Sequence, residues 1–140
     1  FHSALGKPNM TNNLMEVSIG LIVSNNRILL GKRSTGYYAD FWEFPGGKKE
    51  HEETSQDTLY REMFEELNIH VIDATEIMNL RYQHNTNTLH LSIWDIQTYD
   101  GITIANEQQH LQWARIEQLK KISLIPSNAP IIDYLTHTYC

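Results

Sequence analysis

Residues 47–69 have the sequence GKKEHEETSQDTLYREMFEELNI, in which charged residues recur at fixed spacing. A glycine is followed after five residues by a glutamate, after seven more by an Arg-Glu pair, and two residues later by a Glu-Glu pair: Gly47, Glu53, Arg61, Glu62, Glu65 and Glu66. Six specified residues at fixed spacing match by chance at a frequency on the order of 10⁻⁷ per starting position, given ordinary residue frequencies of several per cent. The spacing therefore indicates a structural or chemical requirement.

The same stretch predicts a helix over residues 54–67. Three apolar residues recur at helical spacing along one side: Leu59, Met63 and Leu67. Three carboxylates fall within an arc of about 100° on the opposite side, which we expect to face solvent: Glu62, Glu65 and Glu66. Thr54, with Asp57 three residues later, is typical of a capping box at a helix start. Asn68 predicts the end, because asparagine tolerates the left-handed backbone that terminates many helices.

A glutamate-rich helix face is most often plain solvated surface. Like charges three and four residues apart destabilise an isolated helix by roughly 0.2–0.5 kcal/mol per pair, so a cluster of them needs compensation. Here a Pro-Gly-Gly loop, residues 45–47, precedes the helix, and Arg61 stands beside the first of these glutamates; solvation explains neither. Clustered carboxylates bind divalent cations such as Mg²⁺. We expect Arg61 to orient and stabilise the glutamates, with a surface ion pair as the alternative.

The rest of the chain predicts mostly strands. Runs of β-branched, aliphatic and aromatic residues mark residues 14–23, 28–30, 41–44, 71–82, 89–98 and 111–116. The Ser-Asn-Asn sequence at residues 24–26 predicts a hairpin turn, and Asp100-Gly101 a second turn. Residues 131–135, after Pro130, predict a second helix. Many strands with few helices predict an α+β fold, a mixed β-sheet sandwiched between helices in α/β/α layers.

Composition limits the classes of protein that fit. The chain has 140 residues, 41% of them hydrophobic, which suffices for one core and is too few for two ordinary domains. We expect residues 1–9 to be a leader foreign to the native chain and residues 10–140 to form the single domain. The net charge of −6 argues against extended contact with nucleic acid. The single cysteine, Cys140, suits a reducing compartment, so we expect a cytoplasmic protein.

The spacing in residues 47–69 resembles the Nudix box. That motif runs Gly, five residues, Glu, seven residues, Arg-Glu, an aliphatic residue, any residue, Glu-Glu, any residue, Gly and an aliphatic residue. The matching positions here are Gly47, Glu53, Arg61, Glu62, Met63, Glu65, Glu66 and Ile69. Asn68 stands where the family has glycine; because asparagine adopts the same left-handed backbone at modest cost, the departure puts little in doubt. The resemblance implies a Nudix fold and a metal-dependent pyrophosphohydrolase.

Outside the box, residues 14–135 are similar to the MutT-like 8-oxo-dGTP diphosphatases. Glu107, six residues before Trp113, matches a glutamate that reaches the metals from outside the helix in that subgroup. Asn128, in the sequence PSNAP, matches an asparagine that recognises the purine base. The resemblance also places two basic residues at the substrate: Arg33 lining the nucleotide site and Lys48 facing the phosphates.

The resemblance further implies the chemistry. Mg²⁺, for which Mn²⁺ could substitute, would be held by a backbone carbonyl and four carboxylates: Gly46, Glu62, Glu65, Glu66 and Glu107. Water would attack the β-phosphorus of a nucleoside triphosphate and release a nucleoside monophosphate and pyrophosphate. The candidate catalytic residues are Glu62, Glu107, Glu53 and Arg61. Glu107 or Glu62 ranks first as the general base, and Glu53 as a supporting residue.

The favoured substrate is 8-oxo-dGTP, which implies sanitation of the nucleotide pool and avoidance of mutation. The alternative is another nucleotide, such as a pyrimidine triphosphate or a nucleoside diphosphate derivative, because the box determines the chemistry and not the base. A third possibility is a non-catalytic Nudix-like binding module, against which the intact glutamates argue. We expect a monomer acting on a small nucleotide, with neither a nucleic acid polymer nor a membrane as partner.

Overall fold

The computed structural model describes residues 13–33, 39–106, 110–124 and 126–140. One sheet has the strand order β5 (Gly46–Lys48), β1 (Asn13–Leu21), β7 (Asn87–Asp100), β6 (His70–His84). The other contains β2 (Val23–Ser24), β3 (Arg27–Lys32) and β4 (Trp42–Glu43), with β8 (His110–Arg115) also paired to β3. The helices are α1 (Ser55–Leu67) and α2 (Ala129–Tyr139), with short 3₁₀ helices η1 (Ile116–Lys121) and η2 (Pro126–Asn128).

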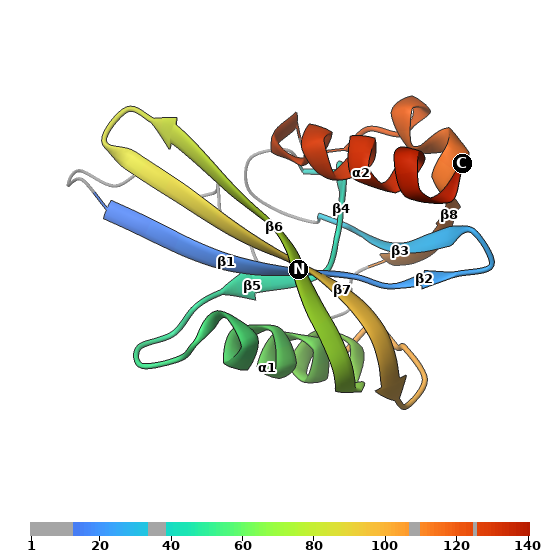
Figure 1. The fold of residues 1–140 in the computed structure, drawn as a ribbon, viewed down its shortest axis with the longest axis horizontal. Helices are drawn as coiled ribbons and strands as arrows, with labels where there is room; N and C mark the ends of the chain where they lie inside the picture. Colours follow the sequence, from blue (N-terminus) through green and yellow to red (C-terminus); the bar gives the residue numbers. More distant parts are fainter. Residues whose placement is uncertain (1–12, 34–38, 107–109, 125) are drawn as a thin grey trace.

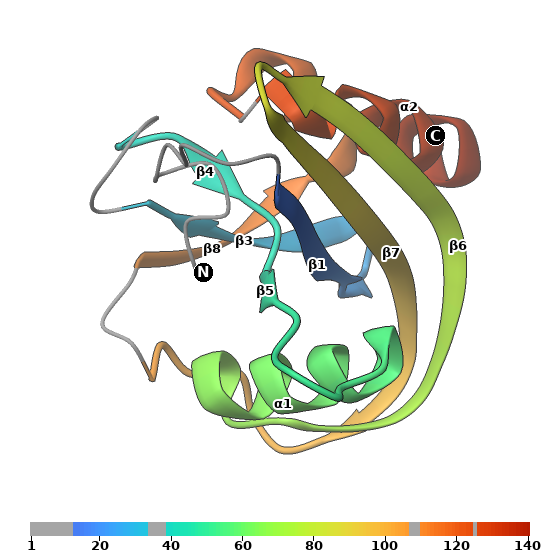
Figure 2. The same ribbon diagram turned by 90° about the vertical axis from the view of Figure 1, so that its left-hand side faces the viewer.

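The sheets lie between the two helices, as Figure 1 and Figure 2 show, with α1 on one side and α2 on the other. This arrangement confirms the predicted α+β fold with α/β/α layers. Each helix packs on its own cluster of buried apolar residues. In one cluster, Leu59, Met63 and Leu67 of α1 are fully buried against residues of β6 and β7, among others. The other cluster includes Ile131 and Leu135 of α2.

The first sheet is mixed in direction. β1 pairs with β7 in parallel over residues 13–21 and 87–95, and with β5 antiparallel. β6 and β7 form a long antiparallel pair that is interrupted by register shifts near Val71, Asp73 and Glu76. Both strands extend beyond the predicted residues 71–82 and 89–98, because the predicted limits followed hydrophobic runs and the backbone pairing continues through polar residues. β1 therefore lies in the middle of the sheet, beside the loop that precedes α1.

The predicted turns and helix ends are present. Asn25 and Asn26 both have positive φ, 52° and 59°, between β2 and β3, as the twist of a two-residue hairpin turn requires. Thr54 and Asp57 form both hydrogen bonds of the capping box, and Asn68 ends α1 in the left-handed conformation with φ 59°. The second helix is longer than predicted, since it begins at Ala129 and includes Pro130 in its first turn. No helix in the described part of the chain is long and apolar enough to cross a membrane.

Candidate functional site

Arg61 is the centre of the hydrogen-bond network on α1. Its Nε donates to Glu53 Oε2 at 2.6 Å and its Nη2 to Glu53 Oε1 at 2.9 Å. Its Nη1 donates to Glu62 Oε1 at 2.7 Å and to Glu65 Oε1 at 2.8 Å. Nη2 also donates to the backbone carbonyl of Lys48 at 2.9 Å. One guanidinium thus joins the end of β5 to three carboxylates. Its planar fork of donors makes these contacts possible, and a lysine side chain has no such fork.

The Glu53 carboxylate accepts hydrogen bonds from several neighbouring groups. Besides Arg61, its carboxylate accepts from the Glu50 backbone N–H at 2.8 Å and from the Thr58 hydroxyl at 3.1 Å. The hydrogen bonds from Arg61 lower the pKa of Glu53 to about 2, against the opposing effect of burial. A carboxylate with so low a pKa is poorly suited to take a proton from water, so this geometry favours a supporting role for Glu53 over that of a general base.

The carboxylates of α1 do not share one solvent-facing side, and here the sequence-based expectation was wrong. Glu62 and Glu66 are buried, with 2% and 0% of their surface exposed, whereas Glu65 is exposed. Burial raises the pKa of Glu66 well above its ordinary value, and the hydrogen bond and charge of Glu62 act in the same direction. The helical pattern treats every glutamate as a surface residue, but in the fold the Gly47 backbone of β5 lies directly against the Glu62 carboxylate.

The glycines of β5 make that close approach possible. A Cβ atom added to Gly47 would overlap the Glu62 carboxylate, and one added to Gly46 would overlap the Ser18 carbonyl oxygen. Within β1, on the face toward α1, a Cβ at Gly20 would lie 2.7 Å from Ile96 Cδ1 and 3.1 Å from Met63 Sδ. The absence of side chains at these positions lets α1 pack directly on the backbone of β1 and β5.

The donor set of this region suits a hard divalent cation. Glu62, Glu65 and Glu66 offer only oxygen ligands, within two turns of one helix. Among the described residues, no three His, Cys, Asp or Glu side chains converge into a complete cage around one point. Mg²⁺ does not require such a cage, because it binds through one or two carboxylates and completes its shell with waters and substrate phosphates. The residues present therefore fit the metal that the sequence implies.

The other predicted site residues lie on separate elements. Lys48 is half-buried at the end of β5, next to the Arg61 network. Arg33 is buried after β3, with its Nε 4.0 Å from Glu43 Oε2. Asn128 is 4% exposed at the start of α2, and the preceding Ser127 carbonyl accepts a 2.7 Å hydrogen bond from the Tyr82 hydroxyl. Glu107 lies outside the described residues.

A second hydrogen-bonded group touches α1 and has no signal in the sequence. The Ser18 hydroxyl donates to the Ser55 carbonyl at 2.7 Å and lies 3.2 Å from the Ser55 hydroxyl, while the Trp94 indole donates to the Ser55 hydroxyl at 3.0 Å. These residues come from β1, α1 and β7, far apart in the chain. Their contact could be predicted only from the pairing of the strands.

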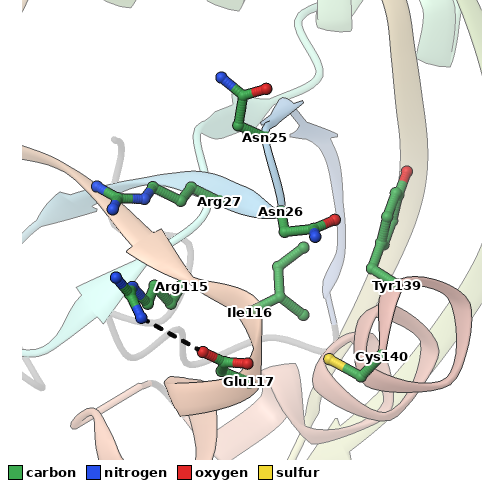
Figure 3. A pocket seen from close by; sticks show the side chains of 8 residues that line it. All are labelled: Asn25, Asn26, Arg27, Arg115, Ile116, Glu117, Tyr139 and Cys140. Atoms are coloured by element: carbon green, nitrogen blue, oxygen red, sulfur yellow. Dashed lines mark ion pairs between the residues drawn. The ribbon is translucent and has the colours of Figure 1, made fainter.

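A pocket of about 290 Å³ lies far from these residues in the chain, between the β2–β3 turn, the end of β8 and the end of α2. Figure 3 shows its lining, which includes Arg27, Arg115, Glu117 and Tyr139. Arg115 Nη1 lies 3.7 Å from Glu117 Oε1, so the charge of one arginine is partly balanced within the pocket. None of the predicted site residues lines it, so this pocket is separate from the group of residues around α1.

Comparison with known proteins agrees with this geometry. A model of the NUDIX domain matches residues 14–135. The CTP pyrophosphohydrolase of Escherichia coli K12 is 30% identical over 121 residues, which cover 86% of this chain and 90% of the relative. The 8-oxo-dGTP diphosphatase of the same strain is 28% identical over 123 residues, 86% of this chain and 95% of the relative.

The fold is that of a solved structure from a study of MutT of Aliivibrio salmonicida and Vibrio cholerae. The TM-score is 0.80 at 24% identity, and the match covers 91% of this chain and 100% of the other. Because the NUDIX model spans most of the chain, and because the structure brings the acidic and basic residues of its motif together on α1, the chain belongs to the Nudix hydrolase family.

Proposed function

We propose that this protein hydrolyses a nucleoside triphosphate to a nucleoside monophosphate and pyrophosphate in a reaction that depends on Mg²⁺, with Mn²⁺ as a possible substitute. The main support is the set of carboxylates on α1: Glu62 and Glu66 are buried, Glu62 lies against Gly47 of β5, and Glu65 is exposed. Mg²⁺ binds in proteins through a few carboxylates together with waters and substrate phosphates. A divalent cation between these groups and a polyphosphate would fit this donor set.

The proposed ligands of two or three Mg²⁺ ions are the Gly46 carbonyl and the carboxylates of Glu62, Glu65, Glu66 and Glu107. When bound, Mg²⁺ neutralises the phosphate charge and lowers the pKa of water. Lys48, at the end of β5, would contact the phosphates. This contact would hold the attacked phosphorus in line between the water and the leaving oxygen. Arg61 and Glu53 would act as positioning residues, because their contacts fix Glu62 and Glu65.

The general base is proposed to be Glu62 or Glu107. Glu53 is disfavoured because its low pKa leaves it a weak proton acceptor. Glu62 is buried beside Glu66 and hydrogen-bonded to Arg61, so it is held in one orientation and could receive a proton from a water in line with the β-phosphorus.

We propose 8-oxo-dGTP as the preferred substrate, with Asn128 and Arg33 at the nucleoside. The Asn128 amide is nearly buried and forms no capping hydrogen bond with α2, so its donor and acceptor are suited to the edge of a base. CTP is the second candidate, because a CTP pyrophosphohydrolase is 30% identical to this chain, slightly more than the 28% of an 8-oxo-dGTP diphosphatase. The protein would act as a monomer, formed by residues 10–140, on the free nucleotides of the cytoplasm.

A nucleotide panel tests this proposal. Purified protein is assayed for pyrophosphate release from 8-oxo-dGTP, dGTP and CTP with Mg²⁺, and again with a chelator. We expect kcat/KM to be highest for 8-oxo-dGTP and activity to vanish with the chelator; a higher value for CTP would select the second candidate. Release of no pyrophosphate from any of the three nucleotides would reject the proposed hydrolysis of a nucleoside triphosphate.

A further inference from the structure

We propose that Ser18, Ser55 and Trp94 form a positioning clamp that sets the rotation and depth of α1, and thereby the separation between the Gly46 carbonyl and the carboxylates of Glu62 and Glu66. The proposal rests on the metal site proposed above. None of its three residues is among those specified by the motif in residues 47–69, and they belong to β1, α1 and β7.

The hydrogen bonds of the clamp form one directed chain. The Trp94 indole N–H can only donate, and it donates to the Ser55 hydroxyl. The single hydroxyl proton of Ser18 is used in the 2.7 Å bond to the Ser55 carbonyl. The 3.2 Å contact between the two hydroxyls therefore has Ser55 as donor and Ser18 as acceptor. Each donor has a partner, so the group holds one arrangement.

Helix geometry connects the clamp to the carboxylates. Ser55 begins α1, and Glu62 and Glu66 follow it by seven and eleven residues. At about 100° per residue, both lie within about 20° of the direction in which Ser55 points. The three side chains thus form one stripe along the side of α1 that faces β1 and β5. Rotation of the helix at Ser55 would displace both carboxylates sideways by the same angle.

Ser18 is joined to both halves of the proposed metal site. Its side chain bonds to Ser55 at the start of the helix, and its backbone pairs with Gly47 in the β1–β5 ladder. Its carbonyl oxygen also lies against Gly46, where a Cβ atom would not fit. Ser18 is 2% exposed, so water does not replace its hydrogen bonds readily. One residue therefore sets the glycine strand and the carboxylate helix relative to each other.

Binding of Mn²⁺ without nucleotide, measured by titration calorimetry, tests the clamp independently of turnover. We compare Ser18→Ala, Ser55→Ala and Trp94→Phe with the conservative Ser55→Thr, which keeps the hydroxyl. The matched control is Ser92→Ala, which removes a buried serine from β7 whose hydroxyl bonds to Asn79 and not to α1. Melting temperature and the separate kcat and KM for the nucleotide are measured on each variant.

We expect Ser18→Ala, Ser55→Ala and Trp94→Phe to weaken Mn²⁺ binding by about 10- to 100-fold, the effect typical of groups that orient metal ligands. Their kcat should fall while KM for the nucleotide changes little, and Ser55→Thr and Ser92→Ala should bind Mn²⁺ as the parent does. Parent-like Mn²⁺ binding in Ser18→Ala and Trp94→Phe, with Glu66→Gln deficient, would overturn the clamp alone. Parent-like binding in both Glu62→Gln and Glu66→Gln would overturn the proposed metal site and the clamp with it.

Discussion

The Arg61 guanidinium and the Glu53 carboxylate are joined at two points, Nε to Oε2 at 2.6 Å and Nη2 to Oε1 at 2.9 Å. The pair lies across the start of the site, one partner on the loop after β5 and the other on α1. Because the same guanidinium also reaches Glu62 and Glu65, the loop and the carboxylates are held as one unit.

A lysine cannot make these contacts, since it has no planar fork of donors. We expect Arg61→Lys to destabilise the fold by about 1–3 kcal/mol, because hydrogen-bond partners of the guanidinium are left unsatisfied, and to lower kcat by roughly 10- to 100-fold. Urea unfolding and pyrophosphate release measure the two effects. Arg115→Lys, at an exposed ion pair with Glu117, is the control and should change neither. Full activity in Arg61→Lys would show that the guanidinium geometry is unimportant.

The ion pair should also give the stability a pH dependence. Arg61 lowers the pKa of Glu53 from 4.5 to about 2, so the stabilisation from this carboxylate is complete above about pH 4.5 and is lost as the pH falls toward 2. At pH 6 the free energy of unfolding of the parent protein should exceed that of Glu53→Gln by at most about 3 kcal/mol. This difference should shrink between pH 4.5 and pH 2. Urea unfolding across that range measures it. The exposed neighbour variant Glu52→Gln provides the baseline, and a difference independent of pH would contradict this account.

Glu65→Gln and Glu66→Gln should behave differently in stability although both lower turnover. Burial raises the pKa of Glu66 above its ordinary value of 4.5, so this carboxyl costs stability increasingly as the pH rises above 4.5 and fully once the pH exceeds the raised pKa, and a neutral amide avoids the cost. In a chelator at pH 7.5 we expect Glu66→Gln to raise the Tm, by about 4 °C for each kcal/mol relieved. Glu65 is exposed, and its replacement should leave the Tm nearly unchanged. With Mg²⁺ present, kcat should fall by about 10³-fold in Glu66→Gln; near-normal turnover would mean that Glu66 is not a metal ligand.

Asn128 is expected to affect recognition of the base more than the chemical step. Its amide can both donate and accept hydrogen bonds, which alanine cannot. Asn128→Ala should raise KM for 8-oxo-dGTP by about 10-fold or more with a smaller change in kcat, and should reduce the preference over dGTP. Ser127→Ala, at the adjacent position, is the control. An unchanged substrate preference in Asn128→Ala would reject the assignment.

The position of bond cleavage is testable with isotope. If water attacks the β-phosphorus, hydrolysis in ¹⁸O-labelled water places the label in pyrophosphate and leaves the monophosphate unlabelled. Mass spectrometry of both products after a single turnover measures this, with unlabelled products incubated in the same water as the exchange control. Label in the monophosphate would show attack at the α-phosphorus and end the mechanism proposed here.

Local features of the site could be predicted from the sequence. Thr54, Asp57 and Asn68 marked the ends of α1 correctly, because a capping box and a left-handed cap depend on residues within a few positions of one another. The Asn-Asn turn between β2 and β3 was predictable for the same reason. Each of these signals is complete within its own short stretch of chain.

Features that depend on distant segments could not be predicted. The burial of Glu62, which lies against Gly47 of β5, and the burial of Glu66 depend on parts of the chain outside the helix, which helical periodicity does not represent. The bonds joining Ser55 to Ser18 and Trp94 require the pairing of β1 with β7. That pairing is parallel and has no sequence pattern that would distinguish it from the alternatives.

The parallel pairing of β1 with β7 also constrains the order in which this chain can fold. Every strand from β2 to β6, and α1 with them, is synthesised between the two partners, so the hairpins and the helix can form while the centre of the first sheet is still incomplete. Closing so long a loop is entropically costly, and non-local pairing of this kind slows folding. Until β7 arrives, α1 lacks the Trp94 indole that bonds to Ser55 and the Ile96 side chain that packs with Leu59 and Met63, so the packing of α1 is completed only after β1 and β7 have paired.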